Sequence, residues 1–350
     1  MHNDVQIPGI KETPFGNLIY GELAKGCLLC MRGRKLVIFA TGVCHYNCFY
    51  CPISLEKRGR NIIFANERQV KRLGDILEEA ELMDAEGAGI TGGEPLYRFD
   101  ETINIIMLLK EHFGKDFHIH LYTGAVDLVS KKYKKLVEAG LDELRIHLKS
   151  RKEWSFITTL SRRAGDCISV GIEVPIIPRK EDFLLSMLNF LAYECEVEFV
   201  NLNELEFSES NALSLLERGF KLRDGSSAAV KGSYETGLRV LRSIVKNKLP
   251  LNIHLCTTLY KGTYQTALLY FRRGINVAET CEMVEDNGLL LYVLLENFVE
   301  EAPVALFKRV YGGTAKVHAE TIKYLASKPN LVYKIVEETP THVRIKISET

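Results

Sequence analysis

The stretch Thr41-Gly-Val-Cys-His-Tyr-Asn-Cys-Phe-Tyr-Cys-Pro52 carries three cysteines, Cys44, Cys48 and Cys51, on one short segment. It follows an apolar run at residues 36–41, which predicts a buried strand. Three thiolates at this C-x3-C-x2-C spacing can ligate three irons of a cubane [4Fe–4S] cluster and leave the fourth iron without a protein ligand. A structural zinc site is the alternative, but three ligands on one loop at unequal gaps favour the iron–sulfur centre.

Short apolar runs alternate with longer amphipathic runs from about Lys35 onward, which is typical of repeated βα units. Strands are expected at 36–41, 87–90, 117–122, 143–148, 169–177, 198–205 and 251–256, with helices at 70–84, 102–112, 128–139, 152–164, 180–193 and 234–246. Parallel strands with right-handed crossovers then form a partial or open TIM-type (β/α)6–7 barrel of the α/β class. Functional residues of such a barrel lie at the carboxyl ends of its strands.

Two shorter segments flank the expected barrel, which takes residues 35–284. Residues 1–34, with several Gly and Pro, predict an irregular lead-in that carries a cysteine pair. Residues 285–350 predict a small α+β appendage of βαββ order, with a strand at 288–296 and a mostly helical stretch at 304–327. A hairpin of residues 331–338 and 342–348, turning at Thr339-Pro340-Thr341, completes the appendage.

A second motif, Ile90-Thr-Gly-Gly-Glu-Pro-Leu96, lies at the carboxyl end of the second predicted strand. Paired glycines let a backbone approach a ligand closely, and the carboxylate of Glu94 can bind a charged amino group. An ordinary strand-to-helix turn would explain this motif if it stood alone. Its position on the βα unit after the cysteine loop favours a ligand site.

The two motifs together resemble the radical S-adenosylmethionine (SAM) superfamily, within which the layout is most similar to proteins related to pyruvate formate-lyase activating enzyme. The superfamily has this cysteine spacing on the first barrel loop, an aromatic residue before the last cysteine, and a Gly-Gly-Glu-Pro that binds the SAM amino group. The resemblance implies a [4Fe–4S] cluster on Cys44, Cys48 and Cys51, and SAM contacts from Tyr50, Gly92, Gly93 and Glu94.

Further SAM contacts are expected from the third and fourth strands. Thr123 ends the third strand, and Arg145, His147 and Lys149 follow one face of the fourth at period two. These side chains could hold the ribose or carboxylate of SAM, or the substrate, and a polar rim is the alternative. Acidic residues at the end of the sixth strand, Glu204 and Glu206, are candidate substrate ligands, although a solvated strand end would also explain them. No catalytic residue is assigned.

A second metal site is predicted from four residues outside these motifs. Cys27 and Cys30 form a C-x2-C pair, which supplies half of a tetrahedral site. His254 and Cys256 project from one face of the last predicted strand, which is expected to lie beside the lead-in segment. The four residues would hold zinc, or three cysteines would hold an auxiliary iron–sulfur cluster. Buried cysteines without a metal are the remaining alternative.

The resemblance implies an enzyme in which a reduced cluster cleaves SAM to a 5′-deoxyadenosyl radical that abstracts hydrogen from a substrate. The electron would come from a donor such as ferredoxin or flavodoxin. Small metabolites or cofactor precursors, partner proteins (including glycyl-radical activation) and RNA stay open as substrates. An iron–sulfur electron carrier or a metal-stapled binding scaffold is the alternative from another class, which the missing fourth cluster ligand disfavours.

Composition narrows the partners and the compartment. Lys plus Arg number 45, as do Asp plus Glu, so a nucleic-acid partner is possible but not favoured and a small metabolite fits best. Five of the nine cysteines lie within residues 27–51, which fits metal ligation in a reducing compartment better than a disulfide framework. No apolar run is long enough for a membrane span, and no leader segment is expected, so the interpretation is an anaerobic cytoplasmic enzyme.

Overall fold

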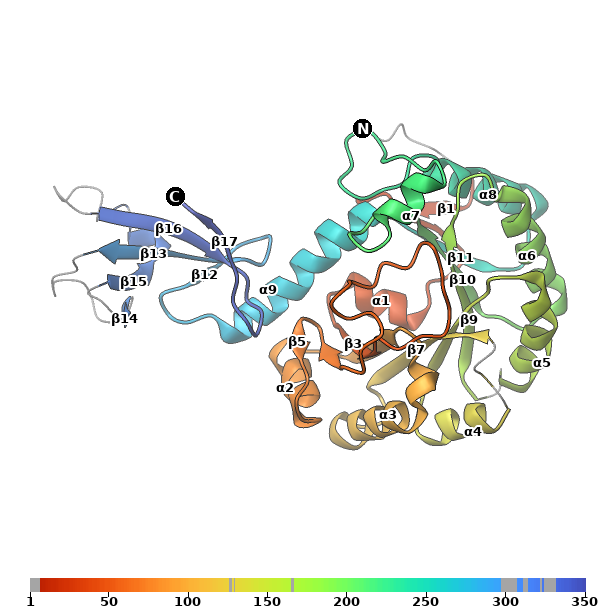
Figure 1. Cartoon of the computed structure of the whole chain (residues 1–350), viewed down its shortest axis with the longest axis horizontal. Helices are drawn as coiled ribbons and strands as arrows, with labels where there is room; N and C mark the ends of the chain where they lie inside the picture. The colour runs from red at the N-terminus through yellow and green to blue at the C-terminus, as the bar shows by residue number, and fades with distance from the viewer. Residues whose placement is uncertain are drawn as a thin grey trace.

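The computed structural model describes residues 7–125, 128, 130–164, 167–296, 307–310, 314–321, 323 and 332–350. Its larger sheet has eleven strands in the order β1-β2-β11-β10-β9-β8-β7-β6-β3-β4-β5 (Figure 1). The central strands run parallel to one another. They are β3 (Lys35–Thr41), β6 (Gly87–Gly92), β7 (His118–Gly124), β8 (Glu143–His147), β9 (Ser169–Ile176), β10 (Phe199–Glu204) and β11 (Asn252–Cys256).

These parallel strands are the seven that the sequence predicts, with ends that differ by at most about two residues. The partial or open barrel is confirmed, because β3 and β11 are not neighbours in the sheet. β11 pairs with β2 on its outer side, and β3 pairs with β4. The strands are nearly continuous apolar runs because helices cover one side and the barrel interior lies on the other.

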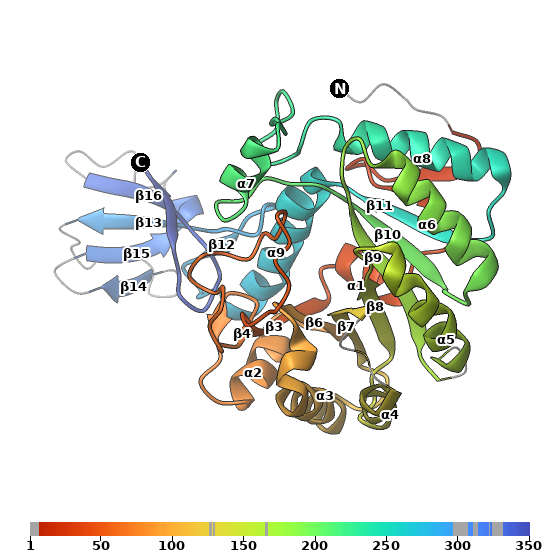
Figure 2. The same ribbon diagram turned by 45° about the vertical axis from the view of Figure 1, so that its right-hand side comes forward.

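Helices pack on the outside of the curved sheet (Figure 2). In α6 (Glu181–Glu194), the buried side chains are Leu184, Met187, Leu188 and Leu191, the i, i+3, i+4, i+7 spacing of one helix face. Burial of that face against the strands fixes the helix on the sheet. The other outer helices are α2 (Gly74–Leu82), α3 (Phe99–Phe113), α4 (Ser130–Glu138), α5 (Trp154–Ala164) and α8 (Ser233–Asn247); the short α7 (Ala212–Glu217) follows β10.

The sequence predicted an irregular N-terminal segment, but the structure shows regular elements there. The segment forms β1 (Ile10–Glu12), β2 (Leu18–Tyr20) and the short helix α1 (Lys25–Met31). β2 extends the sheet beyond β11, with Leu18 opposite Leu255 and Ile19 opposite His254. From there α1 enters the concave side of the sheet and contacts β3, β6 and β7. Elements this short give no periodic signal, so turn residues dominated the prediction.

The long helix α9 (Thr266–Val277) leads away from the barrel to a second sheet (Figures 1 and 2). A single π-type turn, Tyr260–Gln265, precedes α9. The buried Arg273 of α9 forms an ion pair with Glu79 of α2, with 2.8 Å between Nε and Oε1, and this pair ties α9 to the barrel. Across the described ranges, no helix combines the length and the apolar character that a membrane crossing would need.

The second sheet is antiparallel, in the order β14-β15-β13-β16-β17, with β12 paired to β13. The mostly helical stretch expected at 304–327 is wrong at 307–310 and 314–318, because both segments are strands. A 3₁₀ turn occupies 319–321. The remaining parts that lie outside the described residues are 304–306, 311–313, 322 and 324–327. The expected hairpin is present as β16 and β17. The strands are β12 (Met283–Val284), β13 (Leu290–Glu296), β14 (Phe307–Val310), β15 (Thr314–His318), β16 (Val332–Glu338) and β17 (Lys346–Glu349).

Candidate active site

The three cysteines of the loop after β3 border a cavity of about 450 Å³, here called the outer cavity. Cys44, Cys48 and Cys51 line it together with residues from the carboxyl ends of β6, β7 and β8. Those residues include Gly92, Gly93, Glu94, Thr123, His147 and Lys149. The fold therefore gathers both sequence motifs, and most of the expected SAM contacts, around one space at the end of the barrel where ligands bind.

The three cysteines line a cavity, and their side chains do not converge on the position of a single metal ion. In the described part of the chain, no group of three or more His, Cys, Asp or Glu side chains is arranged to hold a metal ion. Burial raises the pKa of the Cys44 and Cys48 thiols, while the nearby Lys149 ammonium acts in the opposite direction. Because iron binds thiolates, these thiols must lose their protons when metal enters. A donor set of three thiols around a cavity fits a group with several metal atoms.

The paired glycines are required by the backbone of the cysteine loop. Gly93 N–H donates to Thr41 O at 2.7 Å, and Glu94 N–H donates to Val43 O at 2.9 Å. A Cβ on Gly93 would lie 2.3 Å from Val43 O, and one on Gly92, whose φ is +138°, would lie 2.5 Å from Thr41 O. From the sequence, these glycines were expected to let the backbone approach a ligand. In the structure they let the two motifs pack together, which positions both around the outer cavity.

Glu94 is buried, and its carboxylate is held in one orientation. Thr123 Oγ1 donates to Oε1 at 2.6 Å, Leu96 N–H donates to the same oxygen at 3.0 Å, and Gly124 N–H donates to Oε2 at 2.8 Å. Thr123 is therefore a positioning residue for Glu94. A fixed carboxylate that borders the cavity is a group that binds a charged donor such as an ammonium.

Tyr50 and His147 form a hydrogen-bonded pair beside the cysteine loop. His147 Nδ1 lies 2.9 Å from the carbonyl oxygen of Glu173, so Nδ1 carries the proton and Nε2 accepts from the Tyr50 hydroxyl at 2.8 Å. Burial lowers the pKa of His147, which keeps the ring neutral and consistent with this direction. Burial, with Cys48 nearby, raises the pKa of Tyr50, so the phenol stays protonated.

The barrel interior continues below the outer cavity. A middle cavity of about 230 Å³ shares Tyr122, Thr123 and His147 with the outer one. An inner chamber of about 480 Å³ shares Tyr122 with both, and it shares Arg145, Glu173, Asn203, Glu206 and Lys261 with the middle cavity. The shared lining residues place these cavities next to one another in the barrel interior, from the cysteine loop to α1.

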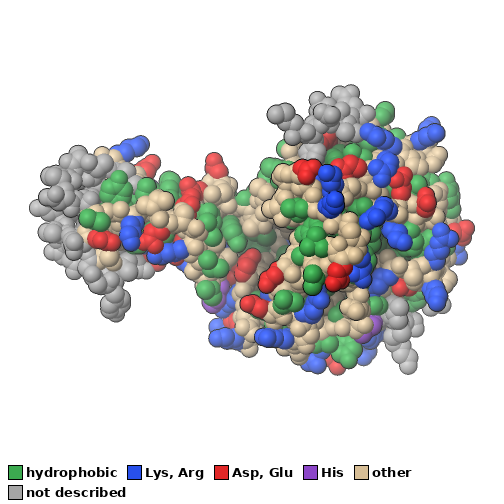
Figure 3. All heavy atoms as spheres, turned by 45° about the horizontal axis from the view of Figure 1, so that its top comes forward, with side chains coloured by type: hydrophobic (Ala, Val, Ile, Leu, Met, Phe, Trp, Pro, Cys, Tyr) green, Lys and Arg blue, Asp and Glu red, His purple; other side chains and the backbone are tan. Residues whose placement is uncertain are grey.

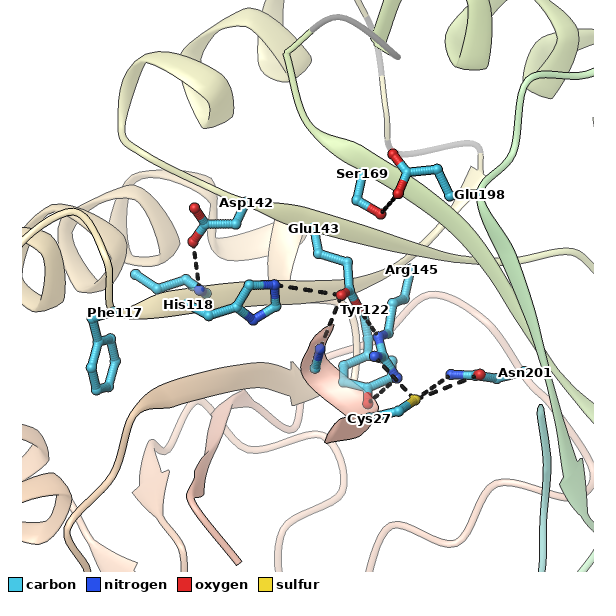
Figure 4. Close-up of polar contacts among 12 residues, drawn as sticks. Cys27, Phe117, His118, Tyr122, Asp142, Glu143, Arg145, Ser169, Glu198 and Asn201 are labelled. Carbon is cyan, nitrogen blue, oxygen red and sulfur yellow. Dashed lines mark hydrogen bonds and ion pairs between the residues drawn. The ribbon is translucent and has the colours of Figure 1, made fainter. Parts of the chain in front are cut away.

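Arg145 lies deep in this interior and not at the mouth (Figure 4). Its guanidinium binds Glu143, donates to Glu173 Oε2 at 2.9 Å, and reaches Cys27 Sγ at 3.4 Å. Glu173 also accepts from Asn201 at 3.0 Å and Asn203 at 2.9 Å. Burial favours the neutral acids, but the Arg145 charge outweighs it and lowers the pKa of Glu143 and Glu173. The interior is a network of buried charges, directly below the position expected for SAM.

The four residues predicted for a second metal, Cys27, Cys30, His254 and Cys256, all line the inner chamber. Burial raises the pKa of Cys256 to about 12 and also raises that of Cys27, so both are thiols without a metal. The predicted neighbourhood of α1 and the last strand is therefore present, although the four side chains are not gathered around one point.

Several residues of this interior are missed by sequence reasoning. Tyr46 borders the outer cavity, packs against Gly124 and lies under the Lys149 ammonium. Other missed lining residues are Lys35, Tyr122, Glu173, Asn201 and Lys261. A polar residue inside an apolar strand, such as Asn201, was the only available signal, and it is also typical of structural hydrogen bonding.

Comparisons with known proteins agree with this geometry. The family model of the radical SAM superfamily matches residues 38–155, which hold both motifs. A Methanocaldococcus jannaschii protein, provisionally named a glycyl-radical enzyme activating enzyme, is 37% identical over 280 residues, or 78% of this chain and 73% of that protein. The chain belongs to the radical SAM superfamily, and the relation to activating enzymes expected from its motifs is confirmed.

Two further similarities are more distant. A Saccharolobus islandicus protein, provisionally named GTP 3′,8-cyclase, is 30% identical over 323 residues, or 86% of this chain and 97% of that protein. A solved radical S-adenosylmethionine methyltransferase from Kitasatospora setae aligns with a TM-score of 0.40 at 11% identity. That alignment covers 72% of this chain and only 56% of the methyltransferase.

The family assigns a [4Fe–4S] cluster and SAM as cofactors, and the protein is an enzyme. The reduced cluster, when bound, supplies the electron that cleaves SAM to the 5′-deoxyadenosyl radical, which abstracts hydrogen from a substrate. The donor set of the outer cavity fits this pair, because three thiols border it opposite a fixed carboxylate.

Proposed function

We propose that this enzyme holds its cluster on Cys44, Cys48 and Cys51 and acts on a small polar metabolite bound inside the barrel. The observation that carries the proposal is the set of adjoining cavities in the barrel, because Tyr122 lines the outer cavity and both chambers below it. A substrate in the middle cavity lies directly below the SAM position. The 5′-deoxyadenosyl radical reacts only with a carbon held against it, so substrate must reach this depth.

In this proposal the residues of the outer cavity bind SAM. The oriented carboxylate of Glu94 accepts the SAM amino group, and Thr123 keeps that carboxylate in place. Tyr50 and His147 form the wall between the outer and middle cavities, and their neutral pair excludes water without adding charge. Lys149, on the rim, is the candidate partner for the SAM carboxylate.

The middle cavity supports a polar, small substrate. Arg145, Glu173 and Lys261 line it, so both signs of charge are offered within about 230 Å³. On the face drawn in Figure 3, Lys and Arg are interspersed with Asp and Glu and form no continuous basic surface that would suit nucleic acid. The GTP 3′,8-cyclase name of one relative concerns a small molecule, whereas the activating-enzyme name of the other concerns a partner enzyme.

The reductant and the compartment are further parts of the proposal. All nine cysteines are free, which suits a reducing cytoplasm. A low-potential one-electron donor such as ferredoxin or flavodoxin would approach the rim beside Cys44, which is the exposed member of the triad. We divide the chain at residues 34 and 284, so that the barrel carries the reaction and the second sheet stands outside it.

The test uses the reconstituted, dithionite-reduced protein under anaerobic conditions with SAM, and it measures 5′-deoxyadenosine. A low-mass fraction of a cell extract should raise product formation several-fold above the uncoupled rate. Glu173→Gln should lose this stimulation, whereas Glu181→Gln, in an exposed pair with Arg239, should keep it. Stimulation by the macromolecular fraction alone would replace the metabolite with a protein or RNA substrate. No 5′-deoxyadenosine at all would remove the assignment of the outer cavity.

A further inference from the structure

Three cysteines that the outer site does not use face one another across the inner chamber. Cys27 and Cys30 come from α1, where i and i+3 positions share a helix face, and Cys256 comes from the end of β11. Cys27 and Cys256 are only 5% and 9% exposed. Segments more than two hundred residues apart in sequence therefore deliver thiols to the same buried space.

The position of α1 is fixed by contacts that serve Cys27. Gly26 N–H donates to the buried Glu143 carboxylate at 3.1 Å. A Cβ on Gly26 would lie 2.7 Å from both Arg145 Nη2 and His120 Nδ1, so a larger residue here would displace these buried side chains. Arg145 and Asn201 then reach Cys27 Sγ at 3.4 and 3.3 Å, as Figure 4 shows. Donors directed at sulfur are a feature of iron–sulfur ligands.

A second observation points to a bound group. His254 is 6% exposed and lines the same chamber, yet neither of its ring nitrogens has a hydrogen-bond partner among the residues that the structure describes. The hydroxyl of Tyr260, another lining residue, is also unpartnered. An imidazole with both nitrogens unsatisfied is costly in a buried site unless a ligand or metal completes it.

Lys35 adds a charge argument. Its side chain also lines the chamber and is 9% exposed, and among the described residues no carboxylate forms an ion pair with it. Burial and the Arg145 charge act to lower the pKa of Lys35, and the nearby Cys30, Tyr122 and Cys27 outweigh them and raise it. A buried cation normally has an anionic partner. Thiolates bound to iron, together with the cluster's own sulfides, would supply that negative charge.

We propose that Cys27, Cys30 and Cys256 hold a second iron–sulfur cluster in the inner chamber, with His254 as the nitrogen donor to its remaining iron. A cluster is preferred to a zinc ion because the side chains border a chamber of about 480 Å³ and are not gathered around a point. The same is true of the triad at the outer cavity, in a family whose cofactor is a cluster. A substrate in the middle cavity would then lie between two clusters.

The test counts iron and acid-labile sulfide in anaerobically reconstituted protein, with zinc measured in parallel. Wild type should hold about eight irons per chain, as expected for two [4Fe–4S] clusters. The variant Cys44→Ala/Cys48→Ala/Cys51→Ala should keep about four irons and a cluster signal in Mössbauer spectra. Cys27→Ser/Cys30→Ser/Cys256→Ser should also hold about four, and Cys195→Ser, which lies outside the barrel interior, should match wild type.

The triad variant makes the result independent of whether the inner variant folds. If it binds no iron while wild type binds about four, the inner cluster does not exist. One zinc per chain, retained by the triad variant and lost with Cys256→Ser, would also overturn the proposal. Neither result affects the outer site, because its own test is 5′-deoxyadenosine formation. His254→Ala should shift the electron paramagnetic resonance spectrum of the inner cluster, and an unchanged spectrum would remove His254 from its ligands.

Discussion

Thr123 Oγ1 lies 2.6 Å from Oε1 of Glu94, and this hydrogen bond joins β7 to the Gly-Gly-Glu-Pro turn after β6. Both residues are buried, so the carboxylate cannot obtain a replacement donor from bulk water. Thr123, which was expected to contact SAM, also holds the Glu94 carboxylate in place.

Thr123→Val should weaken SAM binding about tenfold, because removal of one donor to a buried carboxylate costs on the order of 1–3 kcal/mol. Isothermal titration of reconstituted protein with SAM would measure this. Thr102→Val is the matched control, since its buried hydroxyl donates to Pro95 O at 2.8 Å, away from the carboxylate. Equal SAM affinity in the two variants would contradict the positioning role.

Gly93→Ala should prevent close packing of the two motifs, because the added methyl would meet Val43 O at 2.3 Å. We expect a loss of several degrees in melting temperature and a large fall in iron incorporation at the cysteine triad. Gly74→Ala, where the new methyl meets nothing within 4 Å, should leave both values near wild type or raise stability slightly. Normal iron content in the Gly93 variant would show that the loop adapts.

Arg145→Met should destabilise the barrel by about 3–5 kcal/mol, because Glu143 and Glu173 would keep buried charges without their partner. Urea unfolding would measure the loss, and Glu143→Gln added to the variant should recover part of it. Arg239→Met breaks an exposed pair with Glu181 and should cost less than about 1 kcal/mol. Similar losses in both variants would mean that the interior charges are solvated.

His120 predicts a dependence of stability on acidity. Burial, followed by the charge of Arg145, lowers the pKa of His120 well below its usual value, and neither ring nitrogen has a partner. The unfolded chain therefore binds a proton more readily, so stability is lost as pH falls below about 6.5. His120→Leu should reduce that loss by up to about 1.4 kcal/mol per pH unit.

The measurement is the difference in unfolding free energy between His120→Leu and wild type at several pH values, because the acid sensitivity of the cofactor then cancels. Thr102→Val, which changes a buried side chain without a titratable group, serves as the control and should give a difference that does not change with pH. A difference for His120→Leu that is equally flat would show that His120 does not titrate below pH 6.5 on unfolding.

The barrel and the outer motifs were predictable because each is a local signal. Buried parallel strands are continuous apolar runs, and the three cysteines of the triad lie on one short segment of sequence. The second sheet was partly missed, because the apolar residues around Phe307 suit a helix as well as a strand.

The barrel interior was less predictable, since it depends on contacts between distant segments. Glu173, Asn201 and Lys35 each stand alone in an apolar strand, and only the register of β9, β10 and β3 brings them to one chamber. Likewise, Arg145 was expected to contact SAM or substrate, or to lie on a polar rim, and its depth was not predicted, because spacing fixes the face of a strand but not the depth of a side chain.

The placement of α1 has a consequence for how the enzyme matures. The helix that closes the chamber is made first, whereas β11, which anchors its neighbour β2, is made more than two hundred residues later. During synthesis the chamber therefore stays open until the last barrel strand is available, and then it is closed from the N-terminal side. The inner chamber is complete only when the two ends of the barrel have paired, whereas the outer cavity is lined by residues 42–149 alone.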